Sequence, residues 1–114
     1  AGQYATEFFK NLGILERVKS KLLLGNNVKS VLTTVETGDV DAGIVYITDA
    51  KNSSKVQIVA IADAKLHSPI RYPIAILKSS KFPTRSRQFV EFLSSKSATA
   101  IFKKYGFGIV KPQP

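Results

Sequence analysis

The clearest chemical feature of the sequence is a tyrosine that follows an apolar run. Residues 42–45 read Ala-Gly-Ile-Val, and Tyr46 comes next. A run of this kind is typical of a strand that is covered on both faces. The phenol is therefore expected at the carboxyl end of that strand, where its O–H group could donate a hydrogen bond to a ligand.

Two predicted helix starts could add backbone donors to the same site. One helix is expected to open at Gly2, and another at residues 25–28, Gly-Asn-Asn-Val, where asparagine is a suitable cap. The first turn of a helix has unpaired N–H groups and the positive end of the helix dipole, so it attracts anions. Each feature alone is common in proteins without a ligand, but Tyr46 and two helix starts at one sheet edge together predict an anion-binding site.

Catalytic and metal chemistry have little support in the sequence. There is one histidine, His67, and no cysteine, so neither a recognisable Ser-His-Asp triad nor a thiolate site is present. Asp39 and Asp41 are typical of a turn between a helix and a strand. We therefore expect a binding protein rather than an enzyme, with no cofactor and no directly coordinated metal.

The elements that would position the donors follow from the spacing of apolar residues. Helices are expected near residues 5–12, 28–35, 83–93 and 98–105. Their end signals are Pro83 in a first turn, Ser95 or Ser97 as a cap, and Gly13, Gly38 and Gly106 as stops. Strands are expected at residues 21–24, 42–47, 56–61 and 70–77, the last interrupted by Pro73. Short strands that alternate with helices predict an α/β fold with a largely parallel sheet.

The composition is that of an ordinary globular chain of 114 residues, with 44% hydrophobic and 22% charged residues. The net charge of +9 is compatible with a solvated basic surface or with nucleic-acid binding. The lysines are scattered, and no aromatic-basic motif of an RNA-binding sheet is present. No nucleic-acid partner is expected, and a small basic nucleic-acid-binding domain is kept as an alternative.

Several motifs together resemble the molybdate-binding protein of molybdate ABC importers. They are Ala1-Gly2-x-Tyr4-Ala5, GNNVKSVLTTVETGDVDAGIVYITDA at 25–50, Lys55-Val56-x-Ile58-Val59, Tyr72-Pro73, and AIFKKYGF at 100–107. The resemblance extends over nearly the whole chain but only over the C-terminal half of the family. It implies a periplasmic-binding-protein-like (type II) fold with three α/β/α layers, here as a C-terminal fragment that lacks its N-terminal half.

The resemblance also implies the ligand-binding residues. Ala1 and Val28 match backbone N–H donors at helix starts, and Tyr46 matches a hydroxyl donor. Together they would hold molybdate or tungstate by hydrogen bonds, without metal coordination and without a charged side chain. The same fold binding another oxyanion, such as sulfate, is the alternative.

A two-lobed organisation is a further implication of the resemblance. Residues 1–69 would complete one ligand-binding lobe, and residues 70–114 would provide a hinge-crossing strand and C-terminal helices of the other lobe. The implied function is capture of the oxyanion in the periplasm or outside the cytoplasm, with a membrane anchor as one option, and delivery to an ABC permease. Uncovered aromatic residues in the last two helices also predict an oligomer of this chain.

Overall fold

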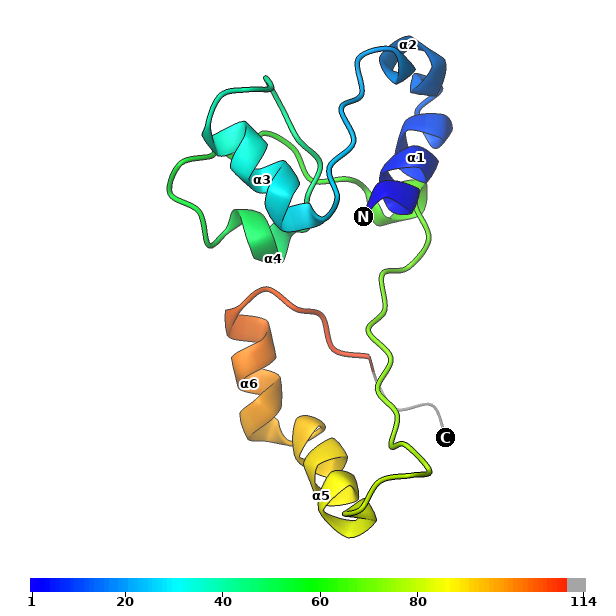
Figure 1. Ribbon diagram of the computed structural model, residues 1–114, viewed down its shortest axis with the longest axis vertical. Coiled ribbons are helices and arrows are strands. Elements are labelled where there is room, and N and C mark those ends of the chain that lie inside the picture. Colours follow the sequence, from blue (N-terminus) through cyan, green and yellow to red (C-terminus); the bar gives the residue numbers. More distant parts are fainter. Residues whose placement is uncertain (111–114) are drawn as a thin grey trace. The chain divides into compact units, whose positions relative to one another are not determined.

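The computed structural model of the protein describes residues 1–110, and its secondary structure is helical (Figure 1). The elements are α1 (Gly2–Asn11), α2 (Leu15–Lys19), α3 (Val28–Glu36), α4 (Ile47–Ala50), the 3₁₀ helix η1 (Ala64–Leu66), α5 (Pro83–Leu93) and α6 (Lys96–Lys104). Internal contacts divide the chain into two units, unit 1 (Ala1–Ile70) and unit 2 (Arg71–Pro114).

The four helices predicted from apolar spacing are confirmed as α1, α3, α5 and α6. Local residues set their ends: the side chains of Asn27 and Ser95 cap α3 and α6, and Pro83 occupies the first turn of α5. The stop glycines have positive φ values, 71° at Gly13, 78° at Gly38 and 89° at Gly106. Glycine adopts this left-handed conformation without the penalty that a Cβ would bring.

The four predicted strands are absent from residues 1–110. Segments 21–24, 56–61 and 70–77 contain no strand, and Ile47 begins α4 instead of ending one. A strand needs a neighbour that pairs its N–H and C=O groups, and the described part of the chain provides no such pairing. The α/β layering expected from the sequence is therefore not seen here, although the apolar runs that suggested it are present.

Unit 1 contains two groups of helices. α1 contacts α2 and η1, whereas α3 contacts α4. In the first group, the side-chain amide of Asn11 donates to the carbonyl oxygen of Leu66 at 2.9 Å. The carboxylate of Glu7 accepts a hydrogen bond from the N–H of Ser68 at 2.6 Å. These polar contacts fix the η1 segment to α1.

Unit 2 is built on α5 and α6, which contact each other. Ala98 is 3% exposed. The ring of Phe107 lies 6.3 Å from that of Phe102 and 5.9 Å from that of Tyr72, both edge to face. This cluster links the segment after α6 to the extended segment with which unit 2 begins.

The apolar surface is poorly covered in both units. Among residues 1–110, only Ala50 and Ala98 are buried hydrophobic residues. The accessible surface is 9863 Å², whereas two separate compact units of these lengths would together expose about 7,400 Å². Local caps and a few contacts, rather than an enclosed core, hold the helices. None of the helices within residues 1–110 has the length and apolar character needed to cross a membrane.

Candidate anion-binding site

The start of α3 is the best-formed part of the candidate site. Asn27 Oδ1 accepts a hydrogen bond from the N–H of Ser30 at 2.8 Å, and Ser30 Oγ accepts one from the N–H of Asn27 at 3.3 Å, which makes a capping box. Within residues 1–110, the N–H groups of Val28 and Lys29 have no hydrogen-bond acceptor. Two donors at the positive end of the helix dipole are therefore available to an anion. The resemblance implied a donor role for Val28 but none for the adjacent amide of Lys29.

Gly25 packs tightly against this first turn. A Cβ at position 25 would lie 2.6 Å from Cγ2 of Val31 and 2.9 Å from Oγ of Ser30. Both distances are shorter than non-bonded contacts allow. The chain therefore approaches α3 at a position that only glycine can occupy without a shift of its neighbours.

Tyr46 lies where the extended segment 42–46 passes into α4. Its backbone is extended (φ −74°, ψ 147°), and its carbonyl oxygen accepts hydrogen bonds from the N–H groups of Asp49 and Ala50 at 3.0 and 3.1 Å. Its side chain is half-buried. The sequence pattern placed Tyr46 at the end of an apolar run but did not reveal that it caps a helix, since a four-residue helix is too short for a periodic signal.

Contacts between α3 and α4 bring the elements of Val28 and Tyr46 together (Figure 1). Gly43, in the segment that leads to Tyr46, lies directly against α3. A Cβ at this position would be 2.7 Å from Cγ2 of Val35 and 3.1 Å from Cγ1 of Val31. Close backbone approach thus fixes the segment before Tyr46 on the apolar face of the helix that Val28 begins.

Ala1 lies in the other helix group of unit 1. It precedes α1, and its carbonyl oxygen accepts a hydrogen bond from the N–H of Ala5 at 2.9 Å. A Cβ on Gly2 would meet no atom within 4 Å, so the first turn of α1 is open. Among the described elements, α1 contacts neither α3 nor α4. No element contact joins Ala1 to Val28 and Tyr46, and its role as a ligand stays a prediction.

The single histidine takes part in a contact between α1 and the η1 segment. The His67 ring lies edge to face with Tyr4, at a centroid distance of 6.1 Å. Hydrogen bonds from Ser68 to the Glu7 carboxylate hold the pKa of Glu7 below its usual value, and the charge of His67 acts in the same direction. Residues 1–110 hold no group of three or more His, Cys, Asp or Glu residues that could bind a metal ion.

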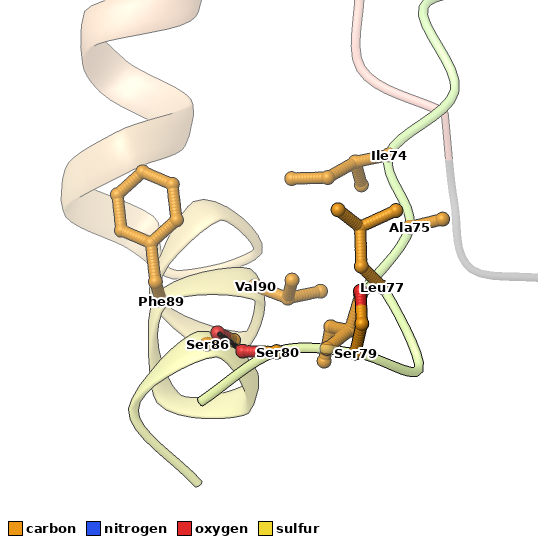
Figure 2. A pocket seen from close by; sticks show the side chains of 9 residues that line it. Ile74, Ala75, Leu77, Ser79, Ser80, Ser86, Phe89 and Val90 are labelled. Atoms are coloured by element: carbon orange, nitrogen blue, oxygen red, sulfur yellow. Dashed lines mark hydrogen bonds between the residues drawn. The ribbon is translucent and has the colours of Figure 1, made fainter. Parts of the chain in front are cut away.

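A cleft in unit 2 has a different character. It has a volume of ≈ 330 Å³ and lies between the extended segment 74–80 and α5 (Figure 2). Figure 2 shows Ile74 and Phe89 on opposite sides, with the hydroxyls of Ser80 and Ser86 3.2 Å apart at one end. Its lining contains no charged residue. An apolar cleft of this kind is unsuited to an oxyanion, because it cannot replace the lost hydration of the charge.

Comparison with known proteins gives consistent matches over nearly the whole chain. The family model described as bacterial extracellular solute-binding protein matches residues 1–108. The chain is 48% identical over 107 residues to the putative ABC transporter substrate-binding lipoprotein YvgL of Bacillus subtilis (strain 168). It is 40% identical over 107 residues to the molybdate-binding protein ModA of Haemophilus influenzae. These matches cover 94% of this chain and 41% and 42% of the two relatives.

A solved structure gives the same result in three dimensions. The substrate binding domain of a putative molybdenum ABC transporter from Clostridium difficile matches with a TM-score of 0.80 and 40% identity, over 96% of this chain and 48% of that chain. The chain thus spans less than half the length of the relatives that it matches. The matched proteins are named for binding rather than for catalysis, and the resemblance inferred from the sequence motifs is confirmed. The chain belongs to the bacterial extracellular solute-binding protein family.

Proposed function

We propose that this chain is part of an extracytoplasmic solute-binding protein that captures molybdate or tungstate and delivers it to the permease of an ABC importer. The observation that carries the proposal is the 40% identity, over 94% of the chain, to a protein named molybdate-binding protein ModA. The unpaired N–H groups at the start of α3 support an anionic ligand.

In the proposed site, neutral donors hold a dianion. The N–H groups of Ala1 and Val28 and the hydroxyl of Tyr46 donate to the oxyanion oxygens, and the helix dipoles disperse the negative charge. A protonated anion is disfavoured, because its extra hydrogen would face a donor. A cavity sized for long metal–oxygen bonds leaves the smaller sulfate short of contacts. The anion is the cargo of the protein and not a cofactor.

The proposed organisation is the two-lobed, three-layered type II fold. Residues 1–69 complete one lobe, and residues 70–114 cross the hinge and contribute helices to the other. Two features support this organisation. The contacts divide between Ile70 and Arg71, next to the proposed boundary. Segments 42–46, 56–61 and 70–77 are apolar runs without strand partners in residues 1–110, as expected if their partners belong to the rest of the protein.

Isothermal titration of the chain with molybdate, tungstate and sulfate tests the proposal. We expect molybdate and tungstate to bind more tightly than sulfate, and Tyr46→Phe to weaken molybdate binding roughly 10- to 100-fold, as for a lost hydrogen bond to a charged group. Tyr72→Phe is the matched control, because Tyr72 is 66% exposed and lies in unit 2. Equal, weak binding of all three anions that Tyr46→Phe leaves unchanged would overturn the proposed site. Tighter binding of sulfate would favour the alternative oxyanion.

A further inference from the structure

The net positive charge of the chain is concentrated in unit 2. Residues 71–114 contain nine Lys and Arg against one acidic residue, Glu91, a net charge of +8. Residues 1–70 contain eight basic and seven acidic residues, a net charge of +1. The basic residues are thus divided almost equally between the units, and the asymmetry arises because seven of the eight acidic residues lie in residues 1–70. Charge asymmetry of this size between two parts of a chain is typical of contact with an anionic surface.

Helix α6 arranges part of this charge on one face. Lys96, Ala100 and Lys103 follow one another at helical spacing, Lys104 lies beside Lys103, and all four are exposed. We call these four residues the basic face of α6. The opposite side of the helix contains the buried Ala98. The lysines thus project away from the side of α6 that is covered within unit 2.

Up to residue 110, the basic side chains of unit 2 lack acidic partners. Between residues 71 and 110, no Lys or Arg forms an ion pair. Two of them instead lie over aromatic rings: Lys104 Nζ is 5.8 Å from the ring centre of Tyr105, and Arg85 Cζ is 5.7 Å from that of Phe82. Cations that are not neutralised within the unit remain available to an external anionic partner.

Apolar and aromatic side chains border the basic face. Ile101 is 53% exposed and Tyr105 is 51% exposed. On the α6 helical wheel the position of Ile101 lies next to that of Lys104, and the ring centre of Tyr105, the C-cap residue of α6, lies 5.8 Å from Lys104 Nζ. Exposed lysines beside an aliphatic residue and a tyrosine suit the boundary between lipid headgroups and acyl chains, where charge meets phosphate and the rings enter the interface.

We propose that unit 2 associates with an anionic phospholipid surface through the basic face of α6. A bilayer surface presents many equivalent negative charges without a fixed geometry, which fits lysines that share a face but converge on no pocket. An acidic protein partner or a nucleic acid would supply the same sign of charge. Neither accounts as well for the uncovered aliphatic and aromatic residues beside the lysines. The association does not depend on which oxyanion the protein binds.

Co-sedimentation of the full chain with vesicles tests the proposal. We expect binding to phosphatidylcholine vesicles that contain phosphatidylglycerol, little binding to pure phosphatidylcholine vesicles, and release at high salt. The triple variant Lys96→Gln, Lys103→Gln, Lys104→Gln should bind about fivefold more weakly per lysine, or on the order of a hundredfold in total. The charge-preserving variant with arginine at the same three positions should bind like the original chain.

A matched variant distinguishes binding through the basic face of α6 from binding that depends only on the net charge of the chain. Lys10→Gln, Lys51→Gln and Lys55→Gln remove the same charge from exposed positions of unit 1, and we expect this variant to keep most of the affinity. Three results would overturn the proposal: an equal loss of binding in both glutamine variants, equal binding to neutral vesicles, or tighter binding to a random DNA duplex at the same salt concentration. Circular dichroism of each variant checks that the helices are retained.

Discussion

Among the single residues, Asn27 has the most direct influence on the candidate site. Its side chain accepts a hydrogen bond from the N–H of Ser30 at 2.8 Å. This bond fixes the turn in which the N–H groups of Val28 and Lys29 are unpaired. Asn27→Ala should cost about 1 kcal/mol of local helix stability. We expect hydrogen exchange of the Ser30 amide, measured by NMR, to become roughly fivefold faster.

Asn26 provides the control for this change. Within the described residues its side chain forms no hydrogen bond, although it has the same chemistry and adjoins the cap. Asn26→Ala should leave exchange in α3 nearly unchanged. Equal acceleration in both variants would contradict the capping role of Asn27.

Glu7 gives the contact between α1 and the η1 segment a dependence on pH. Because hydrogen bonds from Ser68 lower its pKa below 4.5 in the folded state, the ionised carboxylate stabilises the contact above the unfolded value. That stabilisation is lost as the pH falls below 4.5 and through the folded pKa. The chemical shift and exchange rate of the Ser68 amide should therefore change in acid, and Glu7→Gln should abolish this change. A Ser68 titration that persists in Glu7→Gln would contradict the assignment.

At the scale of single residues, the sequence predicts well those features that depend only on neighbouring residues, such as helix caps and stops. Asn27 as a cap and Gly38 as a stop follow from hydrogen bonds and backbone conformations within one or two turns. The sequence cannot show that Gly43 lies against Val35, because that contact depends on how the intervening turn folds back. For the same reason, local sequence patterns cannot predict the distance between Ala1 and the other proposed donors.

The packing of α3 and α4 can be tested at the scale of elements through Gly43. A methyl group at this position would come within 2.7 Å of Cγ2 of Val35, a stiff β-branched side chain. Gly43→Ala should lower the free energy of unfolding by about 1–3 kcal/mol, as typical overpacking does. Urea titration followed by circular dichroism measures this difference.

Gly2→Ala is the matched control for Gly43→Ala. Gly2 lies in the first turn of α1, and an added Cβ there would meet nothing within 4 Å. We expect this variant to be unchanged or slightly more stable, because alanine is a better helix former than glycine. An unchanged urea midpoint for Gly43→Ala would show that the segment before Tyr46 does not pack closely on α3.

Helices and strands differ in how much of their formation the sequence of the segment itself determines. The residues of α5 supply their own helical hydrogen bonds, so its apolar spacing and Pro83 were sufficient to predict it. The run 56–61 has the composition of a buried strand, yet Val59 is 83% exposed and Ile61 is 70% exposed. A strand depends on residues outside its own segment, and for that physical reason the predicted strand is not seen within residues 1–110. The short α2, α4 and η1 were missed because they contain too few positions to show a period.

For the molecule as a whole, we predict self-association, because large apolar side chains are exposed in both units. Leu24 is 85% exposed in unit 1, and Leu77 is 73% exposed in unit 2. Contact between copies would remove such side chains from water, at about 25 cal/mol per Å² of apolar surface. The molar mass from light scattering should therefore increase with protein concentration. A monomer mass at every concentration would rule out the predicted oligomer.

The glycines that end α1, α3 and α6 also bear on the order in which the chain folds. With a stop signal inside its own segment, each helix can form on a timescale of roughly a microsecond, before distant parts of the chain have met. In the proposed two-lobed fold, the extended apolar runs would have to wait for strand partners that are far away in the sequence, and closing such long loops is slow. Gly13, Gly38 and Gly106 would thus separate an early phase of helix formation from a later phase of strand pairing during synthesis of the protein.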